Sequence, residues 1–248
     1  MKIVGVSDIG QKRSMNQDAI FYTPTRIGKL PNLLVLADGM GGENAGDFAS
    51  RVLISQLVEA VQTIKGNMTE ITLLRKAIEQ ANLTVYIDSK TNDDLEGMGS
   101  TIVAASVKNN RLIVANVGDS RLYILRDWTL RQITRDHSYA DEMVAIGRYE
   151  KGSKEYQQDK RILTRAIGTS ANVEIDMFEE DLQDGDVLLL CSDGLTNMVS
   201  EDEIIATFRR TKSLEGAAKS LIRKANASGG YDNISVILAI QEESEADA

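Results

Sequence analysis

The sequence predicts an α+β fold, a four-layer αββα sandwich in which two antiparallel β-sheets pack face to face between two helix pairs. Short apolar runs rich in Val, Ile and Leu follow one another in meanders, as buried antiparallel strands do. One pair of amphipathic helices follows the first strands, and a second pair precedes the last strand. This order is not the strict strand–helix alternation of a doubly wound fold.

The N-terminal third of the chain predicts three strands followed by two helices. The strands are expected at 3–6, 19–22 and 33–37. Apolar residues recur at helical spacing over 49–64 in the first helix and over 71–85 in the second. Asn67 and Glu70 are expected to cap the second helix as a capping-box pair.

The rest of the chain predicts a strand meander, a polar interruption and the second helix pair. Strands are expected at 101–107, 111–117, 121–126, 130–133, 174–179, 187–191 and 234–240. The polar interruption covers 137–161. Ser200 and Glu203 have the spacing of a capping box that opens one helix, and apolar residues over 214–225 indicate the other.

Composition excludes several classes of function. The 248-residue chain has a formal net charge of −9, which argues against nucleic acid as the main partner. Its one cysteine, Cys191, excludes an intramolecular disulfide and fits a reducing compartment, and its one histidine, His137, excludes a His-rich metal site. The apolar runs are too short for a membrane span, and the first residues lack a signal peptide's apolar stretch. We expect a soluble, cytoplasmic protein that is monomeric by default.

Four acidic turns stand at the ends of the most apolar strands. Their carboxylates are those of Asp38, Asp119, Asp193 and Asp232. The first and third end a strand, the fourth begins one and the second lies in a hairpin turn, so all four are expected at one sheet edge. Clustered carboxylates repel unless a cation lies between them, and oxygen ligands without His or Cys suit Mg²⁺ or Mn²⁺. The alternative is four ordinary turns, because Asp-Gly is a common turn dipeptide.

Six short motifs occur along the chain in a fixed order. They are DIGQKRSMNQD (8–18), ADGMGG (37–42), GMGST (97–101), VGDSR (117–121), CSDGL (191–195) and GGYDN (229–233). Together they resemble the motifs of type-2C (PPM) metal-dependent protein serine/threonine phosphatases, bacterial branch, and the resemblance runs from residue 3 to about 240. It implies hydrolysis of phosphoserine and phosphothreonine monoesters. It also implies a flap at about 138–162 beside the active site. The lack of a Pro- or Ser-rich linker predicts one catalytic domain at 1–241, and the acidic composition of 242–248 predicts a disordered tail.

The resemblance implies a centre for two Mn²⁺ or Mg²⁺ ions. Its protein ligands would be Asp38, the backbone carbonyl of Gly39, Asp193 and Asp232. Asp38 would bridge the ions, and Gly39 would let its carbonyl approach a metal because no Cβ is in the way. A third, weaker ion would lie at Asp119 and Asp193. Water activated by the two core ions would displace the Ser or Thr alkoxide directly, without a phosphoenzyme.

Two further residues complete the implied site. Arg13 would bind phosphate oxygens in a bidentate manner, and Asp18 would orient metal-bound water. Without the resemblance, a surface arginine and a turn-capping carboxylate are the simpler interpretations. Met40 stands where many eukaryotic members have a histidine proposed as general acid, a residue that the bacterial branch also lacks. Because methionine donates no proton, the leaving-group proton must come from elsewhere.

The resemblance also implies partners, and two rival functions stay open. Phosphorylated proteins would be the substrates, and a cognate Ser/Thr kinase would be the natural partner. The rivals are a two-metal phosphohydrolase for small phosphates and a catalytically silent, phosphoprotein-binding regulator. The silent protein would be expected to lack metal carboxylates, which this chain retains. The flap is expected to tune substrate choice, and His137 is interpreted as structural.

Overall fold

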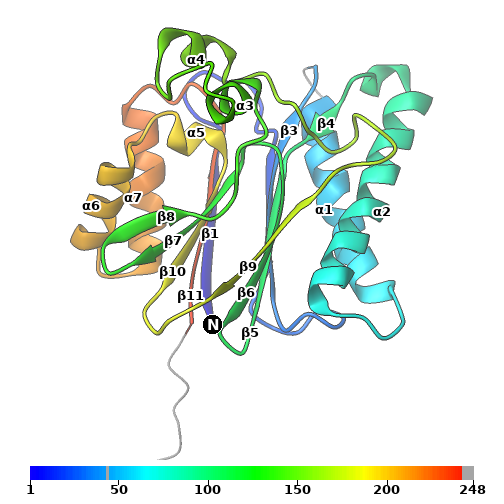
Figure 1. The fold of residues 1–248 in the computed structure, drawn as a ribbon, viewed down its shortest axis with the longest axis horizontal. Coiled ribbons are helices and arrows are strands. Elements are labelled where there is room, and N and C mark those ends of the chain that lie inside the picture. Colours follow the sequence, from blue (N-terminus) through cyan, green and yellow to red (C-terminus); the bar gives the residue numbers. More distant parts are fainter. Residues whose placement is uncertain (43–44, 242–248) are drawn as a thin grey trace, which may run out of the picture.

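Two antiparallel sheets form the centre of the computed structural model, which describes residues 1–42 and 45–241 (Figure 1). One sheet has the order β1 (Lys2–Asp8), β11 (Ile234–Ile240), β10 (Val187–Cys191), β7 (Arg121–Arg126), β8 (Thr129–Gln132). The other has the order β2 (Asp18–Thr23), β3 (Leu33–Met40), β5 (Ile102–Lys108), β6 (Arg111–Val117), β9 (Asp176–Asp181), and β4 (Gly99–Ser100) pairs with β3. The predicted architecture of two packed antiparallel sheets is confirmed.

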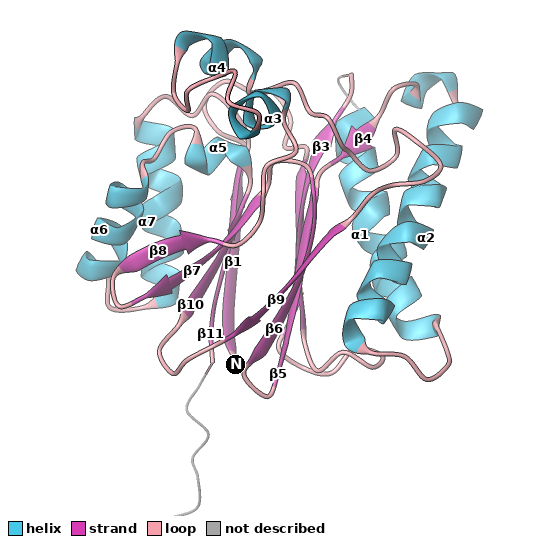
Figure 2. Cartoon of the chain, in the orientation of Figure 1, coloured by secondary structure: helices cyan, strands magenta, loops and turns pink. Residues whose placement is uncertain are grey.

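Helices cover both outer faces of the sandwich (Figure 2). On the β2–β9 sheet lie α1 (Ala45–Thr63) and α2 (Glu70–Thr91), which is followed by the short 3₁₀ helix η1 (Asp93–Leu95). On the other sheet lie α6 (Glu201–Arg210) and α7 (Leu214–Ala227), preceded by the single-turn α5 (Asp193–Thr196). None of these described helices is long and apolar enough to cross a membrane.

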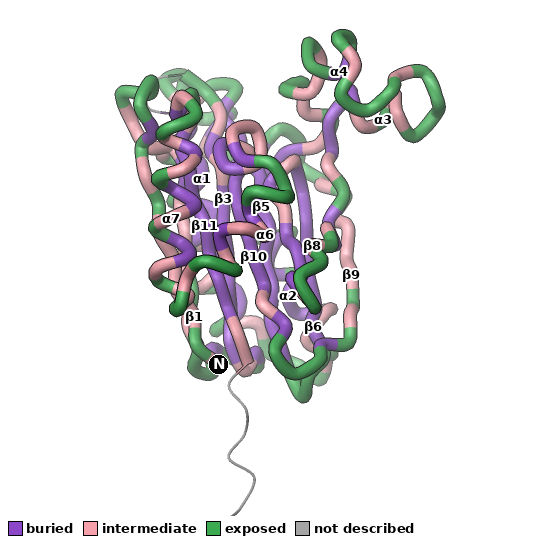
Figure 3. The backbone as a smooth tube through the Cα atoms, turned by 90° about the vertical axis from the view of Figure 1, so that its left-hand side faces the viewer, coloured by how far each residue is buried: buried purple, intermediate pink, exposed green. Residues whose placement is uncertain are grey.

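Three apolar layers hold the sheets and helices together, and they explain why the strand sequences are apolar on both faces. In β3, Leu33 and Val35 face the helix pair, whereas Leu34 and Leu36 face the opposite sheet. A third layer lies between the β1–β8 sheet and the α6–α7 pair. Figure 3 shows the resulting pattern, with buried strands inside and exposed residues on the outer helices and the protruding α3–α4 segment.

Local differences from the sequence prediction concern caps and the polar interruption. The predicted Asn67 cap is wrong: Thr69 caps α2, its side chain accepting from the Thr72 N–H, while Glu70 forms an ion pair with Lys108. The predicted Ser200–Glu203 capping box is confirmed. The interruption contains two short helices, α3 (Tyr139–Ala145) and α4 (Lys154–Asp159), which the sequence did not predict. The expected tail at 242–248 lies outside the described residues.

The topology brings distant parts of the chain to one end of the sandwich. β1 and β11 pair along their whole length, from Lys2 opposite Ile240 to Asp8 opposite Ile234. At the same end, Asp18 at the start of β2 is directly opposite Asp38 near the end of β3. The ends of β10 and β6 and the start of β11 therefore bring their acidic turns to this edge.

Leu53 tests the helix-to-sheet packing, because it lies fully buried at the α1 face of the core. Leu53→Ala should lower the free energy of unfolding by about 2–5 kcal/mol, through lost burial and the cavity left behind. The matched control is Leu83→Ala in α2, where the side chain is 45% exposed and the change should stay within about 0.5 kcal/mol. Urea unfolding of both variants measures the difference, and equal losses would contradict the assigned packing.

Candidate metal centre

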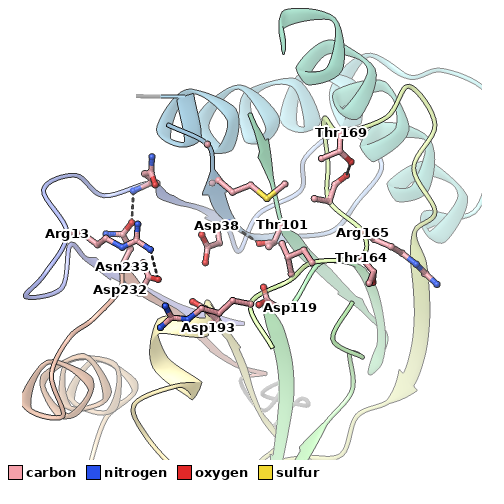
Figure 4. A pocket seen from close by; sticks show the side chains of 17 residues that line it. Arg13, Asp38, Thr101, Asp119, Thr164, Arg165, Thr169, Asp193, Asp232 and Asn233 are labelled. Carbon is pink, nitrogen blue, oxygen red and sulfur yellow. Dashed lines mark hydrogen bonds and ion pairs between the residues drawn. The ribbon is translucent and has the colours of Figure 1, made fainter. Parts of the chain in front are cut away.

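An acidic pocket of about 470 Å³ lies at this end of the sandwich. Six of the seven predicted site residues line it: Arg13, Asp38, Gly39, Asp119, Asp193 and Asp232. Figure 4 shows the four carboxylates gathered around the same space, each from a different part of the chain. The fold thus brings together residues that are up to 219 positions apart, such as the hydrogen-bonded Arg13 and Asp232.

Asp18, the seventh predicted residue, lies behind the pocket rather than on its lining. Its side chain is 8% exposed, and Oδ2 accepts a 2.7 Å hydrogen bond from the Ser192 hydroxyl. Its Oδ1 is buried and has no hydrogen-bond partner. Because Ser192 immediately precedes Asp193, this bond connects the start of β2 to the acidic turn after β10.

Two glycines allow the acidic turns to pack closely. A Cβ on Gly39 would lie 1.9 Å from the carbonyl oxygen of Gly46, and a Cβ on Gly194 would lie 1.9 Å from that of Asn233. Both distances are far shorter than a van der Waals contact, so neither position has room for a larger residue. For Gly39 the structure supplies a steric reason, contact with the start of α1, in addition to the metal-approach reason considered from the sequence.

Hydroxyl groups fix Asp38 relative to the turn that carries Asp119. The Asp38 N–H donates to the Thr101 hydroxyl at 3.0 Å, and the Thr101 N–H donates to the Asp38 carbonyl at 2.8 Å. The Thr101 and Ser120 hydroxyls are hydrogen-bonded to each other at 2.7 Å and are buried. Because Ser120 follows Asp119, the two acidic turns share one buried network.

His137 supports the Asp119 turn from the other side. Its Nδ1 accepts from the Gly118 N–H at 3.1 Å, and its backbone N–H donates to the Gly118 carbonyl at 3.0 Å. The ring is buried, and this burial lowers the pKa of His137. These contacts agree with the structural role expected from the sequence.

Asn233 organises the loop that carries Arg13, a role that the sequence analysis did not assign. Its Nδ2 donates to the carbonyls of Ile9 and Met15, both at 2.9 Å, and its Oδ1 accepts from the Gln17 N–H at 2.8 Å. Arg13 in turn donates to Asp232 Oδ2 at 2.8 Å. In the sequence, the only indication of this role was that the polar Asn233 directly follows Asp232.

Two more arginines from the polar interruption and its exit line the pocket, and the sequence analysis missed both. Arg165 is bound at 2.8 Å to Asp176 and at 3.4 Å to Glu174, and it points away from the carboxylates in Figure 4. The positive charge of Arg161 acts to lower the pKa of Asp193. Neither arginine lies near an acidic motif in sequence, so only the folded chain shows their proximity.

Burial and mutual repulsion raise the pKa values of the clustered carboxyl groups. Burial is the largest cause throughout; it raises the pKa of Asp18 to about 7, of Asp193 to about 6 and of Asp119 to about 8. The pKa of Asp38 is also well above its usual range, again through burial first and then repulsion by Asp18 and Asp193. Such a cluster is costly to ionise unless a cation neutralises it.

The donor set fits hard divalent cations. All of the predicted side-chain metal ligands are carboxylate oxygens. The buried Oδ1 atoms of Asp18 and Asp193 have no hydrogen-bond partner. Within residues 1–42 and 45–241, no three Asp, Glu, His or Cys side chains already close into a metal-binding cluster.

A pocket with several carboxylates and an arginine, on an αββα sandwich, is the arrangement expected of a metal-dependent phosphatase. Residues 5–225 match the family described as Protein phosphatase 2C, and the chain belongs to this family. The serine/threonine phosphatase stp of Listeria welshimeri is 44% identical over 209 residues, which cover 83% of this chain and 83% of that protein.

Solved structures agree with the sequence comparison. A serine/threonine phosphatase from S. agalactiae has a TM-score of 0.86 and 36% identity, covering 97% of this chain and 99% of its own. The catalytic domain of the serine threonine protein phosphatase PstP, solved in complex with two manganese ions, has a TM-score of 0.79 and 33% identity and covers 96% of each chain. The protein is a serine/threonine phosphatase, and phosphorylated proteins are its substrate class.

The raised carboxyl pKa values predict how metal-free stability depends on pH. The folded protein holds protons on Asp18, Asp119 and Asp193 up to pH 6–8, whereas an unfolded chain releases them near pH 4. Because the folded state binds more protons in this window, its free energy of unfolding should fall as pH rises from about 4 to 8. Thermal unfolding in chelator at pH 5.5 and pH 8 measures this fall.

Asp119→Asn provides the control for that measurement. It removes a group whose pKa is raised to about 8, so the fall in stability between pH 5.5 and pH 8 should become smaller. Identical pH profiles of the two proteins would show that Asp119 does not titrate as assigned.

Mn²⁺ should bind more tightly at the higher pH, by up to about tenfold per pH unit for each proton it displaces.

Proposed function

We propose that this phosphatase hydrolyses phosphoserine and phosphothreonine monoesters by direct attack of water at the acidic pocket. The observation that carries the proposal is the convergence of Asp38, Asp193 and Asp232 with Arg13 around one space. The chain's one cysteine does not compete as a nucleophile, because Cys191 is fully buried in β10 and burial raises its pKa to about 12.

Asp38, the Gly39 carbonyl, Asp193 and Asp232 would hold two Mn²⁺ or Mg²⁺ ions. Asp119, with Asp193, would hold a third and weaker ion. When bound, the ions supply Lewis-acid charge that activates water and offsets the negative charge of the phosphoryl group. The two manganese ions of the PstP structure support this assignment by analogy.

The remaining residues would bind and orient. Arg13, now bonded to Asp232, has two N–H groups that match two phosphate oxygens, so it would hold the phosphoryl group at the pocket mouth. Asp18 would accept a hydrogen bond from water at its unpartnered Oδ1. Met40 lines the pocket but donates no proton, so the leaving alkoxide would take its proton from water.

Several wider features belong to the same proposal. Residues 1–241 would form one catalytic domain, with 138–162 as a flap beside the pocket, which the α3–α4 segment supports. A cytoplasmic location, a monomeric state and a cognate Ser/Thr kinase are retained from the sequence. A silent regulator is disfavoured because every predicted metal carboxylate is retained and close to the pocket.

Hydrolysis of a phosphothreonine peptide tests the proposal. Phosphate release should require Mn²⁺ or Mg²⁺, stop with chelator, and fall by at least about 100-fold in Asp193→Ala, since even indirect partners of a metal are worth 10–100-fold. Asp184→Ala is the matched control, because Asp184 is exposed in the turn before β10, the strand that Asp193 follows. Release that survives chelator, or equal loss in both variants, would contradict the assigned centre.

A further inference from the structure

A single side chain fixes the orientation of Asp193. Asn197 lies four residues further on, at the end of α5, where i and i+4 side chains are neighbours. Its Nδ2 donates to Asp193 Oδ2 at 2.8 Å, and its backbone N–H donates to the Asp193 carbonyl at 2.8 Å. The other carboxylate oxygen, Oδ1, is buried and has no hydrogen-bond partner. Asn197 thus occupies one oxygen and leaves the other available.

The amide of Asn197 is itself held by the flap. Lys160, the C-cap residue that follows α4, donates from Nζ to Asn197 Oδ1 at 2.7 Å. A groove of about 300 Å³ lies between α4 and the α5–α6 connection, and this hydrogen bond lies beside it. In the described part of the chain, it is the one hydrogen bond that joins residues 139–162 to residues 193–204.

The chemistry of the three groups gives this chain of bonds one direction. A lysine ammonium only donates, an ionised carboxylate only accepts, and the amide between them does both. The Asn197 amide therefore has one orientation that satisfies both neighbours. If the lysine leaves, the amide loses one of its two fixed partners, and Asn197 holds Asp193 in its orientation less firmly.

We propose that Asn197 is a positioning residue for Asp193 and that Lys160 couples docking of the flap to cation binding at the pocket. The inference rests on the proposed role of Asp193 as a metal ligand. Coupling of this kind is reciprocal, so an ion at Asp193 stabilises the docked flap by the same factor by which the docked flap strengthens ion binding. A purely structural tie would hold the flap without changing cation affinity.

Lys160→Met tests the coupling, because methionine keeps much of the side chain's length but cannot donate. Mn²⁺ binding, measured by titration calorimetry, should weaken by about fivefold or more. Hydrogen–deuterium exchange of α4 should slow when Mn²⁺ is added to the unaltered protein and slow markedly less in the variant. Neither measurement depends on phosphatase activity.

Three further variants complete the design. Asn197→Leu should weaken Mn²⁺ binding by about 10–100-fold, and Lys160→Arg, which keeps a donor, should retain most of the affinity. Lys154→Met, at the exposed start of the same helix, should match the unaltered protein. Thermal unfolding confirms that each variant is folded.

The outcomes separate the inference from the proposed function. If the unaltered protein binds Mn²⁺ and Lys160→Met binds it equally well, with unchanged protection of α4, the coupling is wrong while the metal centre stands. If Mn²⁺ binding is unchanged but α4 exchanges faster in every condition, the tie is only structural and the inference is also wrong. If the unaltered protein binds no Mn²⁺, the proposed centre fails and the inference fails with it.

Discussion

Repulsion among buried carboxylates is the constraint on which this structure depends. Burial raises the pKa of Asp18, Asp38, Asp119 and Asp193, and repulsion adds to it: Asp18, Asp119 and Asp193 each raise the pKa of Asp38. Nothing in their own chemistry would keep them together. The remainder of the fold must supply the free energy that does, and three apolar layers on either side of and between the sheets provide it.

Close backbone packing and a few buried hydrogen bonds fix the positions of the carboxylates within this stable fold. Gly39 and Gly194 let two acidic turns pack against neighbouring carbonyls at distances that no side chain would permit. Thr101 connects Asp38 to the turn that carries Asp119, and Asn233 connects the last acidic motif to the Arg13 loop. Because these contacts join both sheets, the arrangement of the carboxylates depends on the register of the whole sandwich rather than on any one turn.

The sequence predicted the features that depend on neighbouring or periodically spaced residues. It missed those that depend on contacts between segments distant in sequence. Strand ends, acidic turns and apolar stripes are periodic or adjacent signals, so the two sheets, the helix pairs and the convergence of Asp38, Asp193 and Asp232 followed from them. The N-cap of α2 was predicted two residues too early, at Asn67 instead of Thr69. Both are good capping residues, and capping propensity does not decide between them. Arg161 was missed because Asp193, whose pKa it lowers, is distant in sequence. Asn197 was missed because its partners are Lys160, from a distant segment, and Asp193, at the start of a helix of only one turn.

The pairing of β1 with β11 has a consequence for how the protein is made. Among the described strands, β1 is synthesised first, and it pairs in the folded protein with β11, which is synthesised about 230 residues later. At ordinary rates of synthesis, roughly 5–20 residues per second, β1 waits about 10–50 s for its partner. Asp232 arrives just ahead of that partner strand, so an incomplete chain lacks both the closing strand and one of the pocket's carboxylates. Chains that stop before β11 should therefore be inactive, and the complete pocket should form only after β11 has been synthesised.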